Sequence, residues 1–320
     1  MRHCCFAACA ALMMAAFVVT PAHSQAYPTR TIKLVQPSSA GGLSDTISRL
    51  IAQGMTKYFG QTVFVENRPG AMDIIANRAV SRADPDGYTI LYGGINTTMA
   101  PYLRKEAVGF SSTKDLKPIA MATNYAGVFV ATANLPVKTL ADLPAYAAAH
   151  PSNARIANNG TGGSLDITAR LFELKTGTHL AHIPYRGTTE AMRGIIAGEV
   201  ELGTFGLPTG VAFQSKVRVL AQTGNTRHPL LPGVPTTSEL GMAGITYWFG
   251  LYAPPHTPDA IIASLAKSLE TTTNDSVYRK KLENLGAVAE YLPPKAFIER
   301  IEVEDQRWHE LLPEMGLGPE

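Results

Sequence analysis

Two hydrophobic periods alternate along the first hundred residues. Residues 31–37 form a short apolar run rich in β-branched side chains, which predicts a buried strand. Apolar residues then recur at helical spacing up to residue 59, which predicts a helix opened by Ser44 and Asp45. Further strands are predicted at 61–66 and 88–92, with a short helix over 73–82 between them. This β-α-β-α-β order is typical of a parallel sheet with helices on its faces.

A loop of small residues joins the first strand to the first helix. It contains Ser38, Ser39, Ala40, Gly41 and Gly42. Small residues allow close approach of a bound group, and the free N–H groups at a helix start attract anions, so the loop fits a carboxylate cradle. The same residues also fit an ordinary turn capped by Ser44 or Asp45. Taken alone, this loop leaves both interpretations open.

The pattern repeats in the second half of the chain. The predicted strand at 154–157 leads into the small-residue loop 158–164 and then a helix over 165–177, as in the opening stretch. The other predicted elements are two strand-like runs within 116–133, a helix over 140–149, strands at 179–185, 201–205, 217–222 and 247–253, a helix over 189–197, a loop with a short helix at 232–242, and a mostly helical remainder over 258–316.

The N-terminal segment has the pattern of a cleaved signal peptide. Arg2 precedes an apolar run, shorter than the ~20 residues of a membrane span, and small residues follow at the spacing that a signal peptidase reads. We expect cleavage after Ser24 or Ala26 and hence a periplasmic protein. All three cysteines lie before residue 10, so the exported chain would have neither a disulfide nor a cysteine metal site.

Charge and motifs exclude several classes of function. The chain has 28 basic and 26 acidic residues and no basic stripe or acidic tail, which argues against nucleic acid or a membrane surface as partner. It lacks the G-x-S-x-G, phosphate-loop and H-E-x-x-H motifs of common enzyme classes. His179 and His182 would face opposite sides of a strand, so we expect structural roles for them. We therefore expect no enzyme activity, no cofactor and no metal.

What remains is a set of polar loop ends after the predicted strands. Because ligands of open parallel sheets bind beyond the carboxyl ends of the strands, these loops in two halves predict two facing jaws. Neutral N–H and O–H donors suffice to hold a carboxylate. The candidate ligand-binding residues are Ser38, Ser39, Ala40, Gly41, Gly42, Asp45, Asn96, Thr97, Thr98, Asn159, Thr161, Gly162, Ser164, Tyr185, Arg186, Gly187, Phe205 and Trp248. The aromatic residues among them fit pocket walls and core positions equally well.

A series of motifs, in order along residues 27–311, resembles the Bug-type extracytoplasmic solute receptors, the substrate-binding proteins of tripartite tricarboxylate transporters. The motifs are Tyr27-Pro28, Pro37-x-x-x-Gly41-Gly42-x-x-Asp45, Val65-Glu66-Asn67-Arg68-Pro69-Gly70-Ala71, Pro85-Asp86-Gly87-Tyr88-Thr89, His182-Ile183-Pro184-Tyr185-Arg186-Gly187, Leu231-Pro232-Gly233-Val234-Pro235-Thr236 and Trp248-Phe249-Gly250-Leu251. The resemblance implies a periplasmic binding protein fold of type II-like α/β architecture, with two lobes, a two-segment hinge and a small carboxylate in the cleft. Its implied first lobe comprises residues 27–123 and 239–320, and its second lobe 124–238.

Three departures from the family pattern lie at the expected pocket mouth. The usual P-F-x-P-G-G is here Pro37 to Gly42 with Ser38, Ser39 and Ala40 inside it. Met72-Asp73 stands where members commonly continue with glycines, and residues 205–208 lack an acid that many members carry. The ligand's identity is therefore left open by the resemblance.

We favour a monomeric periplasmic receptor that delivers an organic acid to membrane transporter subunits. A receptor of the same fold that signals to a membrane sensor kinase has the same sequence features. An exported hydrolase, using Ser44 or Ser164, has no assembled nucleophile and base in the sequence. We expect the Asp45 side chain to cap its own helix or to position waters in the loop, and not to meet the ligand's carboxylate directly, because like charges would repel.

Overall fold

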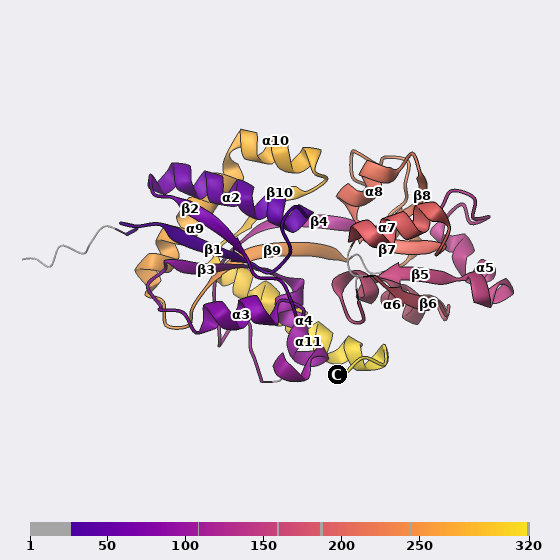
Figure 1. Ribbon diagram of the computed structural model, residues 1–320, viewed down its shortest axis with the longest axis horizontal. Coiled ribbons are helices and arrows are strands. Elements are labelled where there is room, and N and C mark those ends of the chain that lie inside the picture. The colour runs from indigo at the N-terminus through magenta and orange to yellow at the C-terminus, as the bar shows by residue number, and fades with distance from the viewer. Residues whose placement is uncertain (1–26, 108, 159, 186–187, 243–244, 319–320) are drawn as a thin grey trace, which may run out of the picture.

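The computed structural model describes residues 27–107, 109–158, 160–185, 188–242 and 245–318. Figure 1 shows two lobes side by side, joined by two long strands. The first lobe contains β1 (Ile32–Gln36), α2 (Leu43–Phe59), β2 (Val63–Asn67), α3 (Ile74–Ser81), β3 (Thr89–Gly94), α4 (Ile95–Leu103), α9 (Asp259–Asn274), α10 (Ser276–Asn284), β10 (Val288–Leu292) and α11 (Pro294–Glu314). The second contains α5 (Leu143–Ala149), β5 (Arg155–Asn158), α6 (Ser164–Thr176), β6 (Ala181–Pro184), α7 (Thr188–Ala197), β7 (Leu202–Gly206), α8 (Leu207–Phe213) and β8 (Val217–Gln222).

The two connecting strands are β4 (Lys117–Thr132) and β9 (Thr246–Ala253). Residues 117–126 of β4 pair antiparallel with β9, while residues 127–132 pair with β7 and β8 of the second lobe. One strand therefore belongs to both halves of the curled sheet, whose order is β2-β1-β3-β9-β4-β7-β5-β6. A small rotation of β4 near residues 125–127 would move one lobe relative to the other.

Parallel pairing places the loop ends of both lobes where the sequence predicts them. β1 pairs in parallel with β2 and β3, and β5 with β6 and β7. Each helix between two parallel strands runs back along the sheet, so the start of α2 lies at the strand ends that point towards the second lobe (Figure 1).

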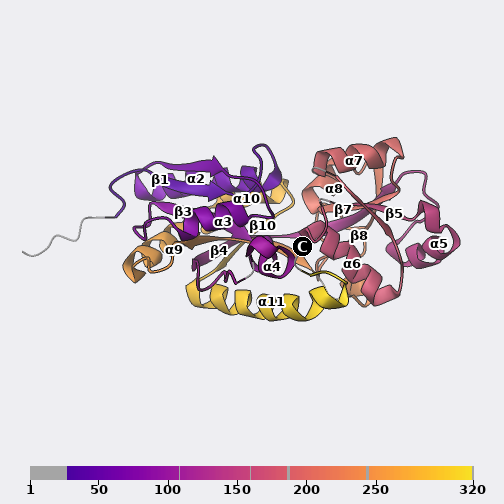
Figure 2. The same cartoon turned by 60° about the horizontal axis from the view of Figure 1, so that its bottom comes forward.

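Separate buried clusters support the two lobes. Ile32, Leu34, Ile47 and Leu265 belong to a core between the first-lobe sheet and helices α2 and α9. Phe129, Phe172 and Leu220 belong to a core of the second lobe. Figure 2 shows α11 running beneath the first lobe towards the second. Its Phe297 packs edge-on against Trp248 at a centroid distance of 5.4 Å.

Two sequence-based element predictions need correction, and two elements were not predicted. The two strand-like runs within 116–133 are one continuous strand, because β4 serves both lobes. The polar stretch after Gly93, predicted to be a loop, is the first turn of α4. The last segment is mostly helical, as predicted, but the strand β10 within it was not predicted; β10 pairs with β4 around residue 123. Helix α8 was also missed, because Pro208 at its second position hid the pattern.

No helix in the described part of the chain has the length and apolar character needed to cross a membrane.

Candidate functional site

The first loop is shaped by side-chain amides at the ends of two strands. Gln36 accepts a hydrogen bond from the backbone N–H of Ser38 through Oε1 at 2.9 Å. Nδ2 of Asn67, at the end of the neighbouring strand, donates to the carbonyl of Ser38 at 2.9 Å. Residues 39–42 are left exposed. The backbone of this loop is therefore fixed while its small residues face solvent.

Asp45 is the buried centre of this arrangement. The residue is 3% exposed, and its carboxylate accepts hydrogen bonds from Gly41 N–H at 2.9 Å, Arg49 Nε at 3.0 Å and Asn67 Nδ2 at 2.8 Å. Burial alone would raise the pKa of this carboxyl, but these three hydrogen bonds outweigh it and hold the pKa below its usual value. The side chain thus positions the backbone of the loop, and it does not cap α2, contrary to one of the two roles predicted for it.

Ser44 does not cap the helix, contrary to one sequence interpretation. The N-cap of α2 is Gly42, which makes no side-chain cap bond, and Ser44 lies within the first turn. The Ser44 hydroxyl instead accepts a hydrogen bond from Gln36 Nε2 at 3.0 Å. Since no side chain caps α2, the N–H groups of its first turn are available to a ligand.

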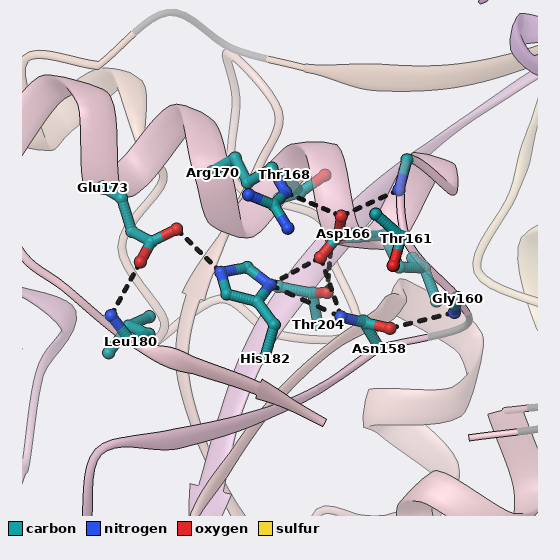
Figure 3. Close-up of polar contacts among 12 residues, drawn as sticks. Asn158, Gly160, Thr161, Asp166, Thr168, Arg170, Glu173, Leu180, His182 and Thr204 are labelled. Atoms are coloured by element: carbon teal, nitrogen blue, oxygen red, sulfur yellow. Dashed lines mark hydrogen bonds and ion pairs between the residues drawn. The ribbon is translucent and has the colours of Figure 1, made fainter. Parts of the chain in front are cut away.

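The second loop repeats this construction residue by residue. Asn158 Oδ1 accepts from Gly160 N–H at 2.9 Å, and Asp166 accepts from Gly162 N–H, also at 2.9 Å. Arg170, four residues on, donates to Asp166 at 2.8 Å (Figure 3). The N-cap of α6 is again a glycine, Gly163, without a side-chain cap bond. The repeated spacing G-G-x-x-D-x-x-x-R at 41–49 and 162–170 is the sequence signal that could have revealed this pairing.

His182 adds a charge to the second loop that the sequence did not predict. Its Nδ1 lies 2.5 Å from Asp166 Oδ1, and its Nε2 lies 2.7 Å from Glu173 Oε2 (Figure 3). Burial opposes the charged form, but the two carboxylates prevail and raise the pKa of His182 to about 9. The imidazolium therefore links β6 to α6 and fixes the start of that helix.

The other candidate residues are divided between the loops and the core. Asn96 is half-buried at the start of α4, whereas Thr97 and Thr98 are fully buried, and Thr98 Oγ1 donates to the carbonyl of Ile95. Phe205 and Trp248 are each buried in a hydrophobic cluster, so they occupy core positions, the second of the two roles that the sequence left open for them. Tyr185 is half-buried against the second-lobe core. Asn159, Arg186 and Gly187 lie outside the described residues.

The lobes touch on either side of the loops. Arg104, which follows α4, donates from Nη2 to the carbonyl of Thr161 at 2.9 Å. A Cβ on Gly162 would lie 3.0 Å from Leu103 Cδ1, so glycine allows this close approach. On the other side, a Cβ on Gly286 would lie 2.7 Å from Leu207 Cδ2. The second loop is thus covered by the first lobe.

Two cavities are lined by residues of both lobes. A cavity of about 590 Å³ at the hinge is lined by residues including Tyr125, Arg227 and Lys280. Another of about 430 Å³ separates α6 from α11 and is lined by residues including Leu171 and Leu311. Residues 38–42 and 160–164 line neither cavity. The second loop therefore belongs to the contact between the lobes, and neither loop forms a wall of these two cavities.

The described residues give no support to nucleophilic or metal chemistry here. The hydroxyl of Ser44 accepts a hydrogen bond from the side-chain amide of Gln36, and His182 lies between the carboxylates of Asp166 and Glu173. Among the described residues, no group of three or more histidine, cysteine, aspartate or glutamate side chains is arranged to hold a metal ion.

Comparison with known proteins gives a consistent result. The sequence profile of a family described as "Tripartite tricarboxylate transporter family receptor" matches residues 47–317. A UPF0065 protein of Bordetella pertussis is 32% identical over 97% of this chain and 96% of its own length. The solved structure of the periplasmic binding protein BugD has a TM-score of 0.80 and 30% identity, covering 92% of this chain and all of BugD. A protein of R. palustris solved with adipate has a TM-score of 0.84 and 28% identity, covering 92% of this chain and all of that protein.

Proposed function

Since this chain belongs to the receptor family of tripartite tricarboxylate transporters, we propose that it captures a small organic acid between its two lobes for uptake by such a transporter. The family expected from the sequence motifs is confirmed, and with it the two-lobed binding-protein fold and the role of solute receptor. The carboxylate class of the ligand is our proposal. It is supported by the R. palustris relative, whose structure contains adipate.

The observation that carries this proposal is the pair of matched helix starts. In each lobe a buried aspartate, Asp45 or Asp166, accepts hydrogen bonds from the N–H of a loop glycine and from an arginine. The helix in each lobe begins at a glycine that provides no side-chain cap. The free N–H groups of the first turn and the positive end of the helix dipole favour an anion. Two such helix starts suit an acid held from both lobes.

The acidic side chains of the loops do not conflict with an anionic ligand. Asp45 and Asp166 are each paired with an arginine, and Asp166 also with His182, so their charges are already balanced within the protein. Each carboxylate is 5% exposed or less and is turned into its own lobe. The ligand would therefore meet backbone N–H groups, and no carboxylate of these two residues.

The finer points of location and assembly are also proposals. Members of this family are periplasmic receptors, and we infer that the segment before Tyr27 directs export. We infer a monomer that meets membrane transporter subunits. We propose that the second lobe begins at residue 124, as the sequence resemblance implies. We propose that the chain returns from the second lobe to the first closer to Ile245 than to Glu239, because Leu240 and Met242 pack against the second-lobe core.

A thermal-shift screen of mono-, di- and tricarboxylates, including aromatic acids, tests the proposal. A ligand at 100 times its Kd would stabilise the folded state by about 2.7 kcal/mol and raise Tm by several degrees. Thr161→Ala and Ser164→Ala should each weaken binding by ~1–2 kcal/mol if these hydroxyls donate to the acid. If none of these acids and no amino acid raises Tm, the proposed function is refuted. Unchanged affinity in both variants would place the pocket elsewhere.

A further inference from the structure

A turn of unusual backbone conformation precedes α3 at the start of the first lobe. Gly70, Ala71, Met72 and Asp73 have φ values of +130°, +48°, +52° and +71°. Side chains other than glycine disfavour this region by roughly 1 kcal/mol or more each, so such a turn persists only where the surroundings fix it. Glycine would suit positions 72 and 73 better. The chain therefore retains Met72 and Asp73 against a local preference.

The Asp73 carboxyl is buried without a positive partner. The residue is 8% exposed and occupies the N-cap of α3, yet its side chain makes no cap bond. Burial raises the pKa of Asp73 to about 7, a hydrogen bond with the Asn96 side chain lowers it, and no cation contributes. Asp45 and Asp166, by contrast, are each paired with an arginine. Asp73 is thus the acid of this region whose charge the described residues leave unbalanced.

The groups around Asp73 present more acceptors than the protein satisfies. Oδ1 of Asn96 is buried and has no hydrogen-bond partner. Because the two amide atoms of Asn96 share one carbon, this oxygen lies close to the carboxylate that its nitrogen meets. One donor, Nδ2 of Asn77, is also buried without a partner. This neutral group cannot offset the charge of a carboxylate. A positively charged donor would satisfy the free oxygen of Asn96 and favour the charged form of Asp73.

Two neighbours of the turn lie near the boundary between the lobes. The charge of Asp73 acts on Tyr125, whose pKa is raised by burial first and then by Tyr247 and Asp73. Tyr125 lies in β4 where it crosses between lobes, with its ring centroid 5.4 Å from that of Tyr247. Met72 packs against a cluster that includes Leu103 of the first lobe and Leu165 of the second. Asp73 therefore lies close enough to β4, the strand shared by both lobes, for its charge to act on Tyr125.

We propose that Asp73 and Asn96 form a subsite for a protonated amino group of the ligand, so that this receptor prefers acids that carry an ammonium group over plain diacids. The inference rests on the proposed function. An ammonium supplies three N–H donors and the missing positive charge in a site with little water. A diacid of the same length would bring a second carboxylate towards an unbalanced acid, which like-charge repulsion disfavours.

Calorimetric titration with matched ligand pairs tests the subsite. The pairs are glutarate with glutamate, adipate with 2-aminoadipate, and butyrate with 4-aminobutyrate. The wild-type protein should bind the amino member of at least one pair about tenfold tighter or better, as a charge-assisted hydrogen bond implies. Asp73→Asn keeps the side-chain shape and removes the charge. It should abolish that preference while changing the affinity for the plain acid less than threefold.

Two further variants keep the test independent of folding. Asp73→Gly restores the residue that the backbone favours and should lose the amino preference in a well-folded protein. Asp84→Asn removes an exposed acid from the same lobe and should leave the preference unchanged. If plain acids bind the wild type as tightly as their amino partners, or if Asp73→Asn weakens both alike, the subsite is refuted and the receptor function stands. If neither kind of acid binds the wild type, the proposed function fails as well.

Discussion

At the scale of single residues, each lobe has a buried aspartate in the first turn of a helix, but the groups that balance its charge differ between the two lobes. Asp45 is balanced by Arg49 and a neutral amide, whereas Asp166 is balanced by Arg170 and by His182, which also contacts Glu173. The second loop therefore depends on a group that can lose its charge as pH rises, and the first loop does not. Stability of the second lobe should follow the ionisation of His182.

We predict that His182→Gln destabilises the protein most at mildly acid pH. The pKa of His182 is raised from 6.5 to about 9 on folding, so its contribution is fully present below pH 6.5 and is lost as pH rises through about 9. The loss should be ~1–3 kcal/mol at pH 6 and much smaller at pH 10. Urea unfolding at both pH values measures it. His179→Gln, at an exposed position nearby, is the control, and an equal loss at both pH values would contradict the assignment.

At the scale of elements, the position of α2 is set by its close contact with α9. A Cβ on Gly54 would lie 2.2 Å from Cγ2 and 2.6 Å from Oγ1 of Thr272, which is itself buried. The two helices thus approach each other through a glycine at the middle of α2, although alanine is the better helix former by ~1 kcal/mol. This contact holds α2, and hence its uncapped start, at a defined distance from the sheet.

Gly54→Ala should therefore destabilise the protein despite the gain in helix propensity. We expect a net loss of ~1–3 kcal/mol in the free energy of unfolding, because a well-packed contact must open to admit the methyl group. Denaturant titration measures this loss. Adding Thr272→Ala removes both of the closest atoms and should recover part of it. A single variant as stable as the wild type would show that α2 and α9 adjust freely.

At the scale of the whole molecule, the lobes are held by a few contacts around a shared strand. Arg104 reaches the carbonyl of Thr161 across the cleft, and Gly162 lies against Leu103. These contacts exist only when the lobes are together, so they bias the equilibrium between open and closed forms. A ligand bound by both lobes acts on the same equilibrium.

Arg104→Ala should weaken ligand binding about fivefold and enlarge the ligand-free molecule. Losing one hydrogen bond between the lobes costs ~1 kcal/mol of the closed form. Calorimetry measures the affinity, and small-angle scattering measures the radius of gyration. Lys105→Ala removes the same charge at the adjacent exposed position and should change neither quantity. If both variants behave alike, the effect is one of charge and not of the contact with Thr161.

The sequence by itself determined the local elements and the family. Hydrophobic periodicity located β1, α2, β5 and α6, and the ordered motifs identified the receptor family, because these signals depend on residues close together in the chain. It also placed the two small-residue loops. It could not separate Asn96, half-buried in the first turn of α4, from Thr97 and Thr98, which are fully buried by packing around that helix.

Only the tertiary structure decided which polar groups meet. The bonds of His182 to Asp166 and Glu173 join β6 to α6, and β4 became one strand because two lobes share it. The raised pKa of Asp73 is likewise a property of its surroundings, since no pattern along the chain shows that this residue is buried beside Asn96 with no cation among the described residues to lower its pKa. Long-range contacts set the charge balance of a site, because electrostatic energy depends on distance and burial, and sequence separation fixes neither.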